Sequence, residues 1–312
     1  MGLNVLSLCD GMSCGQIALK ELGIEVDNYY ASEIDKNAIK VTNDNFPNTI
    51  QIGDINNIDG DMLQKMPKID LILAGTPCRD LSKSTVNGGS PNFKNIHSVG
   101  KGVKGKHSSL FFKFVEILEW IKENNNPDVE FLFENVVMRQ EDETIITGLL
   151  GVNPLLINSN KFSAQNRERL YWSNFKVDPP THTNHLVLKD ILDKEVDEKF
   201  FYNDRGFEFF GEDRNVCAML IQNSHDIGKR VSSKYFKSAT LTSCRGGNLQ
   251  KKVYVDGRCR KLTPNEYRKL QTVPEWYKMD VANSHIYNMC GDGWTIDVIK
   301  YILSFSKCNN KN

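Results

Sequence analysis

The chain has 312 residues, of which 40% are hydrophobic and 25% are charged, as in an ordinary globular protein. This length suits one large domain with a smaller one attached. No apolar stretch is long enough to span a bilayer, and the first residues lack a basic-then-apolar signal region, so we expect a cytoplasmic protein. The eight cysteines contain no CxxC pair, which argues against a zinc site or a disulfide framework, and no metal is expected.

The charges are distributed unevenly although they balance to a net charge of zero. Residues 83–107 hold five lysines and no acidic residue, and residues 229–261 hold ten lysines or arginines and one acidic residue. A charge run is usually a solvated face. A phosphate backbone, however, requires local rather than total positive charge, so these two basic segments favour a nucleic-acid partner.

Strands and helices alternate in the first half of the chain. The run Leu3–Leu8 predicts a strand, followed by a polar turn and a helix that stops at Gly23. A strand over Val26–Ser32 leads to a helix over Lys36–Asn45, which Pro47 ends.

Further apolar strands are predicted at 50–52, 69–74 and 129–133, and residues 109–123 have apolar side chains at helical spacing. The alternation predicts an α/β fold with a doubly wound, mostly parallel sheet. Short β-prone pieces from about residue 178 to 255 predict a second, smaller domain, and a last helix is predicted at 295–305.

Acidic residues follow three successive predicted strands: Asp10, Glu33 and Asp54. Glu33 lies 23 residues beyond Asp10, near the spacing at which an acid of a dinucleotide-binding fold meets ribose hydroxyls. The first turn has Gly11 and Gly15 but not the full GxGxxG pattern, and its acid disfavours a pyrophosphate.

S-adenosylmethionine fits this turn, because it carries an ammonium, a sulfonium, ribose hydroxyls and an adenine amine. We assign Glu33 to the ribose and Asp54 to the adenine amino group. The alternative is that these acids cap the helices that follow them, which for Asp10 and Asp35 is a serious rival.

The turn Gly75-Thr76-Pro77-Cys78 follows a buried strand, and the proline makes it rigid. A second strand end offers Glu134, and two arginines follow at 167 and 169. A cysteine thiolate that adds to carbon 6 of a cytosine makes carbon 5 nucleophilic towards a methyl sulfonium, provided that an acid protonates ring nitrogen 3. Glu134 can supply that proton if Phe131 and Phe133 surround it and favour its neutral form.

With these motifs the chain resembles the DNA (cytosine-5) methyltransferases over nearly its whole length, in the family's usual order. The matching segments are residues 8–15, 31–35, 53–56, 75–82, 133–136, 165–169, 239–247, 261–274 and 291–299. Details such as Gly293-Trp294-Thr295 are closer to the animal de novo enzymes than to typical restriction-modification enzymes. The resemblance implies a Rossmann-like methyltransferase fold that uses S-adenosylmethionine, and double-stranded DNA from which the target cytosine is flipped.

The resemblance also implies three parts: a catalytic and cofactor-binding domain over 1–177, a target-recognition domain over 178–260, and a segment over 261–312 that returns to the catalytic domain. Cys78 is implied as the nucleophile, Glu134 as the acid, and Arg167 and Arg169 as the arginines that contact base and phosphate. Cofactor-binding residues are expected at Cys9, Asp10, Gly11, Met12, Glu33, Ile34, Asp54, Ile55, Gly75, Pro77, Leu110, Asp292, Gly293 and Trp294. DNA contacts are expected at Ser82, Lys83, Lys101, Lys104, Lys106, Thr240, Thr242, Arg245 and Asn248.

Three positions depart from the family's pattern. Cys9 stands where the family usually has a phenylalanine that packs on the cofactor, Asp292 replaces Asn or Arg, and Thr76 replaces Pro or Ser. The first departure predicts a changed cofactor affinity, and none alters the implied chemistry.

Three other functions are weighed against the DNA methyltransferase. A related enzyme that methylates cytosine in tRNA stays open. A catalytically silent DNA-binding relative predicts loss of Cys78 or Glu134, and both are present. A nicotinamide-dependent dehydrogenase lacks the full glycine fingerprint and leaves Cys78 without a role.

Overall fold

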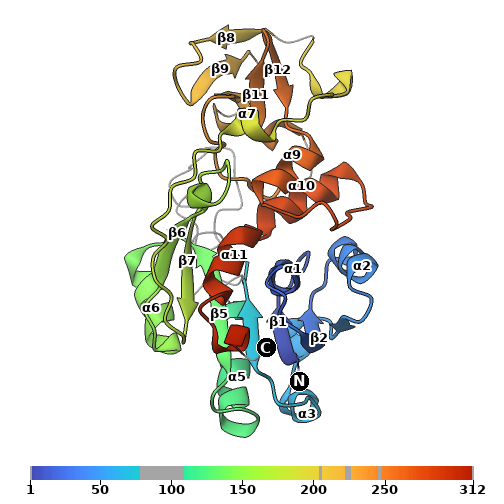
Figure 1. Ribbon diagram of the computed structural model, residues 1–312, viewed down its shortest axis with the longest axis vertical. Coiled ribbons are helices and arrows are strands. Elements are labelled where there is room, and N and C mark those ends of the chain that lie inside the picture. Colours follow the sequence, from blue (N-terminus) through green and yellow to red (C-terminus); the bar gives the residue numbers. More distant parts are fainter. Residues whose placement is uncertain (1, 78–108, 204–205, 222–225, 245–246, 311–312) are drawn as a thin grey trace, which may run out of the picture. The chain divides into compact units, whose positions relative to one another are not determined.

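The computed structural model describes residues 2–77, 109–203, 206–221, 226–244 and 247–310 (Figure 1). The chain divides into two compact units. Unit 1 comprises Met1–Ile157, Glu168–Pro179 and Ile299–Asn312, and unit 2 comprises Asn158–Arg167 and Pro180–Val298. The three functional parts expected from the sequence stay a prediction.

Unit 1 is built on a seven-stranded sheet of order β3-β2-β1-β4-β5-β7-β6. Its strands are β1 (Leu3–Leu8), β2 (Val26–Ser32), β3 (Ile50–Gln51), β4 (Leu71–Ala74), β5 (Glu130–Val136), β6 (Leu155–Asn158) and β7 (Glu168–Ser173). Its helices are α1 (Cys14–Glu21), α2 (Lys36–Asn45), η1 (Ile55–Asn57), α3 (Gly60–Gln64), α5 (Ser109–Asn124), α6 (Gln140–Leu150) and η8 (Lys307–Asn310). Helix α11 (Ile296–Leu303) runs from the end of unit 2 into unit 1.

The first five strands of this sheet are parallel, and β7 pairs antiparallel with β5. The predicted mostly parallel, doubly wound α/β fold is therefore confirmed. The bounds predicted for β1, β2 and α2 agree with the structure.

Local chemistry explains where α2 begins and where α1 ends. The Asp35 carboxylate accepts hydrogen bonds from the main-chain N–H groups of Asn37 and Ala38, so it caps α2. Gly23, with φ of 70°, terminates the segment after α1, as predicted. The capping role considered for Asp35 is thus confirmed.

Helices cover both faces of the sheet. Ile72 of β4 and Phe133 of β5 belong to the core that packs against α5, where the rings of Phe133 and Phe114 stack 5.1 Å apart. Leu73 points to the other face because side chains alternate along a strand. There it meets α1 so closely that a Cβ on Gly15 would lie 2.3 Å from Leu73 Cδ1.

Unit 2 contains a five-stranded sheet of order β12-β11-β10-β9-β8, drawn in yellow to orange in Figure 1. Its strands are β8 (Phe207–Phe209), β9 (Val216–Leu220), β10 (Arg230–Ser233), β11 (Lys252–Val255) and β12 (Arg258–Lys261). Its helices are η5 (Ser159–Lys161), α7 (Leu188–Ile191), η6 (Glu198–Phe200), α8 (Asp226–Lys229), η7 (Gly247–Leu249), α9 (Pro264–Leu270) and α10 (Asn283–Asp292).

Several charges of the basic segment 229–261 stabilise unit 2 itself. Arg260 and Glu266 form an ion pair at 2.6 Å with side chains 2% and 0% exposed. Arg258 pairs with Glu198, and the buried Lys252 donates to a main-chain carbonyl. Fewer positive charges in this segment are therefore available to a phosphate backbone than the number of its lysines and arginines indicates.

Among the described residues, no helix combines the length and apolar character needed to cross a membrane.

Candidate active site

The carboxyl ends of adjacent parallel strands place most of the predicted site residues of unit 1 along one edge of the sheet. Strands β2, β1, β4 and β5 are neighbours in that order and run parallel. Open α/β sheets place their ligands at this edge.

The turn after β1 has a left-handed backbone at three positions. Cys9, Gly11 and Ser13 have φ of 57°, 58° and 57°. This conformation is unfavourable for residues with a Cβ, and such strain concentrates at functional sites. A tight turn of this kind brings its main chain close to whatever binds over it.

Asp10 is held by two hydroxyl groups that the sequence analysis did not anticipate. Ser7 Oγ and Tyr29 Oη donate to Asp10 Oδ1 at 2.6 and 2.8 Å. Asp10 Oδ2 is buried and has no hydrogen-bond partner among the described residues. Burial raises the pKa of Asp10 to about 6, although hydrogen bonds from neighbouring hydroxyls lower it. Ser13, not Asp10, is the N-cap residue of α1, so the capping alternative for Asp10 is wrong.

Glu33 connects the ends of β1 and β2. Its Oε2 accepts from Gly11 N at 2.7 Å, and its Oε1 accepts from Ile34 N and Asp35 N at 2.8 and 2.9 Å. These bonds fix the carboxylate beside the turn after β1. Ile34, next along the chain, is an exposed apolar side chain (70%).

Asp54 lies at the end of the loop that follows β3. Its carboxylate accepts from Asn56 N at 2.9 Å, so it caps η1. Ser32 Oγ at the end of β2 donates to Gly53 O at 2.7 Å and ties this loop to the sheet edge. The capping alternative is thus present at Asp54, and its contact with adenine stays a prediction.

Three other predicted cofactor residues belong partly to the core. Met12 and Ile55 are buried (1% and 3%), and the contact of either with a cofactor stays a prediction. Leu110 is half-buried and packs against the core.

The turn after β4 is anchored to β5 by a residue that sequence reasoning missed. Asn135 Nδ2 donates to Thr76 O at 3.2 Å, and Gly75 N donates to Leu8 O at 3.4 Å. Pro77 is exposed, and it is the last described residue of this turn. The signal for Asn135 was its place directly after Glu134 at a strand end.

Several predicted residues lie outside the described part of the chain. They are Cys78, Ser82, Lys83, Lys101, Lys104, Lys106 and Arg245.

Glu134 and Arg169 are brought together by the antiparallel pairing of β5 with β7. Arg169 Nε donates to Glu134 Oε1 at 2.9 Å, and the two side chains are 13% and 9% exposed. Glu134 faces Tyr171 in the ladder and Val136 faces Arg169. Arg169 is therefore the diagonal neighbour of Glu134 on the same face of the sheet.

The phenylalanines that flank Glu134 in the sequence do not surround it, which corrects our expectation. Phe131 and Phe133 point to the opposite face because side chains alternate along β5. The Phe133 ring packs there against Phe114 and Trp172, with centroids 5.1 and 5.6 Å apart. On its own face of the sheet Glu134 has Arg169 as its ion-pair partner and Tyr171 opposite it in the ladder, and the two phenylalanines lie on the other face.

Three of the described cysteines are poor nucleophiles because their thiols stay protonated. Burial, followed by the neighbouring carboxylates, raises the pKa of the Cys9 thiol to about 12. Burial raises the pKa of Cys217 to about 11 and of Cys259 to about 12. A thiol with so high a pKa stays protonated at neutral pH, whereas the thiolate is the reactive form.

Arg167 belongs to unit 2, where the main chain holds its guanidinium. Nη1 donates to Leu241 O at 2.8 Å, and Nη2 donates to Gly291 O and Gly293 O at 3.1 and 3.0 Å. The residue is 3% exposed. These bonds give Arg167 a structural role, and its contact with base or phosphate stays a prediction.

The remaining predicted residues also lie in unit 2. Thr240 Oγ1 donates to Asn166 O at 2.7 Å, whereas Thr242 is exposed. The side chain of Asn248 is outside the described part. Asp292 is exposed and accepts from Asn288 Nδ2 at 3.1 Å. Gly293 and Trp294 are half-buried.

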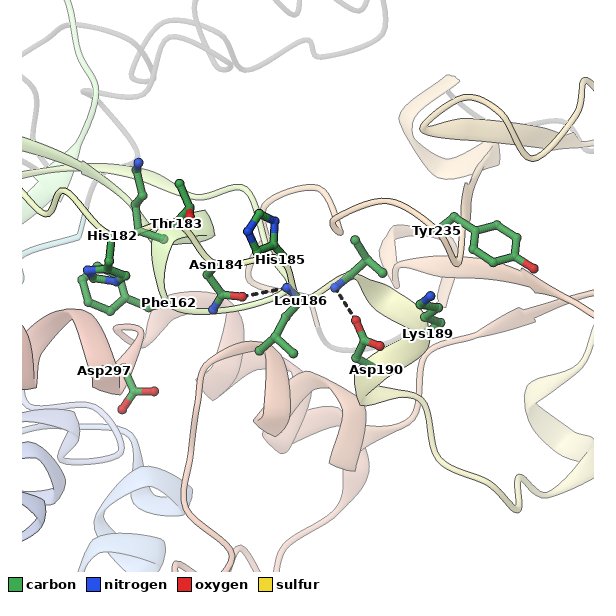
Figure 2. A pocket seen from close by; sticks show the side chains of 12 residues that line it. Phe162, His182, Thr183, Asn184, His185, Leu186, Lys189, Asp190, Tyr235 and Asp297 are labelled. Carbon is green, nitrogen blue, oxygen red and sulfur yellow. Dashed lines mark hydrogen bonds between the residues drawn. The ribbon is translucent and has the colours of Figure 1, made fainter.

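Unit 2 also contains an open groove of about 830 Å³ that the sequence did not suggest (Figure 2). His182 packs edge-on against Phe162, with centroids 4.7 Å apart, and Lys189 lies 5.8 Å from the centre of the Tyr235 ring. None of the predicted site residues lines this groove. No group of three or more His, Cys, Asp or Glu that could hold a metal occurs among the described residues.

Solved structures with the same fold are methyltransferases. The Dnmt2 methyltransferase of S. pombe has a TM-score of 0.67 at 17% identity, with 97% of each chain covered. The methyltransferase EhMeth of Entamoeba histolytica has a TM-score of 0.69 at 13% identity, with both chains fully covered. At these identities the likeness defines the fold, which is that of the Rossmann-like methyltransferases.

Sequence comparison identifies the family. A model described as C-5 cytosine-specific DNA methylase matches residues 3–307. The chain is 27% identical over 327 residues to the type II methyltransferase M.Bsp6I of Bacillus sp. (strain RFL6), covering 96% of this chain and 97% of the relative. It is 25% identical to the type II methyltransferase M.HhaI of Haemophilus parahaemolyticus, covering 96% and 93%. The chain belongs to the C-5 cytosine-specific DNA methylases and is a DNA cytosine-5 methyltransferase.

These two relatives come from bacteria. They do not support the finer likeness to the animal de novo enzymes.

Proposed function

We propose that the enzyme transfers a methyl group from S-adenosylmethionine to carbon 5 of a cytosine flipped out of double-stranded DNA, through a covalent adduct with Cys78. The observation that carries this proposal is the meeting of two predicted elements at the ends of β4 and β5. Glu134 is held there by Arg169, and the next residue, Asn135, holds the turn that leads to Cys78. The type II relatives support a role in restriction and modification.

The residues at the ends of β1 and β2 fit S-adenosylmethionine. Asp10 Oδ2 is a buried acceptor without a partner among the described residues, which suits the ammonium of the amino-acid moiety. Glu33 is held beside the turn by main-chain bonds, where it can accept from a ribose hydroxyl. The exposed Ile34 offers an apolar surface to the adenine. When bound, the cofactor supplies an electrophilic methyl group on a sulfonium.

The chain's own residues activate the cytosine. The Cys78 thiolate adds to carbon 6 of the ring, and Glu134 donates a proton to ring nitrogen 3. This proton neutralises the negative charge that the addition would otherwise leave on the ring. Carbon 5 is then nucleophilic enough to take the methyl group from the sulfonium, and the electrons of the broken carbon–sulfur bond stay on sulfur to give S-adenosylhomocysteine. A base removes the proton on carbon 5, the bond between carbon 6 and the sulfur breaks to release the thiolate, and the proton on nitrogen 3 returns to Glu134.

Arg169 orients the Glu134 carboxyl through Oε1, so the acid approaches the base from a fixed position. The basic segment 83–107, which follows Cys78 in the sequence, is proposed to contact DNA phosphates. Thr242, exposed in unit 2, is proposed as a further DNA contact. Flipping the base costs a few kcal/mol, which these backbone contacts offset.

The cofactor assignment predicts an opposite effect of Asp10→Asn on stability and on binding. The folded pKa of Asp10 is about 6 against an ordinary 3.8, so folding favours its protonated form. The stabilisation is fully present below about pH 4 and is lost as the pH rises through about 6. In the cofactor-free protein, Asp10→Asn should therefore raise the free energy of unfolding by up to about 3 kcal/mol at pH 8 and by little at pH 4. Urea unfolding at both pH values measures this.

The same variant should bind S-adenosylmethionine more weakly at pH 8, because the asparagine has no charge to offer the ammonium. Isothermal titration with the cofactor measures the affinity. A variant that binds as tightly as the wild type would remove Asp10 from the cofactor site.

The covalent adduct tests the proposed function as a whole. Fluorine at carbon 5 of the target cytosine cannot leave as a cation, so the last elimination is blocked after methyl transfer. A duplex with this substitution should give a stable protein–DNA adduct in the presence of S-adenosylmethionine, and peptide mapping should locate the DNA on Cys78. A reaction that methylates normal DNA without trapping any adduct would exclude covalent catalysis.

A further inference from the structure

Two buried glutamines join segments of unit 2 that are far apart in the sequence. Gln165 Oε1 accepts from Leu241 N at 2.7 Å, and its Nε2 donates to Gln271 Oε1 at 3.1 Å. Gln271 Oε1 also accepts from Thr295 Oγ1 at 2.8 Å, and its Nε2 donates to Gly293 O at 3.0 Å. Both glutamines are 0% exposed. Each amide thus uses its donors and its acceptor inside the protein.

Arg167 makes a second connection between the same segments. Its guanidinium donates to Leu241 O on one side and to Gly291 O and Gly293 O on the other. Hydrogen bonds from a charged donor are stronger than those between neutral groups, and breaking them would leave a buried charge. Arg167 therefore resists any separation of the two segments.

The main chains of the two segments are also in direct contact. A Cβ on Gly291 would lie 2.4 Å from Thr242 C and O and from Ser243 N. Nothing larger than glycine fits at this position without moving backbone, so the approach is specific to this residue. The end of α10 and the segment around Thr242 are packed as closely as main chains can be.

We propose that Gln271 is a positioning residue which, with Gln165 and Arg167, makes segments 240–244 and 291–295 one rigid piece. The first segment carries the proposed DNA contacts, and the second carries the residues expected to meet the cofactor. The inference rests on the proposed function for these two contacts. Its consequence is that the part of unit 2 expected to contact DNA and the part expected to contact the cofactor respond together, so that loosening the network weakens both contacts.

The first variant to make is Thr295→Val, which keeps the shape of the side chain and removes only the donor to Gln271 Oε1. Loss of this bond should raise the KM for S-adenosylmethionine and the KM for the DNA duplex together, each by about fivefold, and change kcat less. Thr295→Ser restores the hydroxyl and should return both values towards the wild type. Gln271→Met, which removes the whole set of amide bonds, should have the larger effect in the same direction.

Tyr287→Phe is the matched control. It removes one buried hydrogen bond of similar length, from Tyr287 Oη to Leu262 O at 2.9 Å, in the same unit but outside the network. Its melting temperature should fall about as much as that of Thr295→Val, with both KM values unchanged. Equal rises in KM for the control would show that general loosening, not this network, is responsible.

Hydrogen exchange gives a readout that does not need activity. In full-length Thr295→Val, the amides of 240–244 and of 291–295 should both exchange faster by about fivefold, and those of the control variant should not. Faster exchange in only one of the two segments would overturn the inference. If the wild type transfers no methyl group to DNA while both segments respond together, the proposed function fails and the coupling stands.

Discussion

Replacing Cys78 by alanine is expected to lower methyl transfer on the order of 10⁴-fold or more, with DNA binding retained. The expectation follows from the chemistry, because carbon 5 of cytosine is too weak a nucleophile until a thiolate has added to carbon 6. The described cysteines cannot substitute for Cys78. The pKa of Cys9 is about 12, and the other described cysteines are buried. Transfer of a labelled methyl group in single turnover measures the effect.

Cys308→Ala is a suitable control for this variant. Cys308 is a buried cysteine of unit 1 that lies near Asp70 O and outside the proposed site. It should keep a near-normal rate. Turnover that survives in Cys78→Ala would remove the nucleophile assignment and, with it, the covalent mechanism.

Glu134→Gln is expected to slow methyl transfer by about 10²–10⁴-fold, the usual value of a positioned acid. Glutamine keeps the shape of the side chain, and its carbonyl oxygen can still accept from Arg169 Nε. It cannot give a proton to ring nitrogen 3. The loss should therefore fall on kcat, with the affinity for DNA little changed, in steady-state assays with varied duplex.

The control for the acid is Glu130→Gln, the same substitution at the other end of the same strand. The Glu130 carboxylate accepts from Ser306 Oγ and Lys307 N, so it ties down the end of the chain. This variant should have a lower free energy of unfolding, and each folded molecule should transfer methyl groups at the wild-type rate. A near-normal rate in Glu134→Gln would mean that another group activates the ring.

The parallel half of the fold could be predicted because local signals there agree with one another. Strands β1 and β2 are short apolar runs, and α2 begins at a capping Asp35 and ends before Pro47. The same reasoning placed acidic residues at neighbouring strand ends, where the structure joins Glu33 to Gly11. Helix caps and buried strands depend on residues close in sequence, so they can be recognised without the fold.

The rest depends on partners that are distant in the sequence. The antiparallel pairing that brings Arg169 to Glu134 has no local signal. Alternation along β5 places Phe133 and Glu134 on opposite faces, so nearness in the sequence is a misleading guide to what surrounds Glu134.

Charge and polarity were misjudged for the same physical reason. The basic run 229–261 was read as a surface for phosphates, but Arg260 is buried against Glu266. Gln271 lies in the matching segment 261–274, but its role was not indicated there, because a buried amide and an exposed one look alike in a sequence until their partners are known. A count of charges in the sequence shows where a partner could bind. It does not show which charged side chains are already paired within the folded protein.

The measurement that tests the central claim most directly is methyl transfer to a long duplex of mixed sequence. The enzyme is incubated with S-adenosylmethionine carrying a labelled methyl group, and the modified cytosines are located by bisulfite-type sequencing. The account predicts label in DNA and protected cytosines in one recurring sequence context. A wild-type enzyme that leaves the duplex unlabelled, and labels tRNA or nothing, would contradict it.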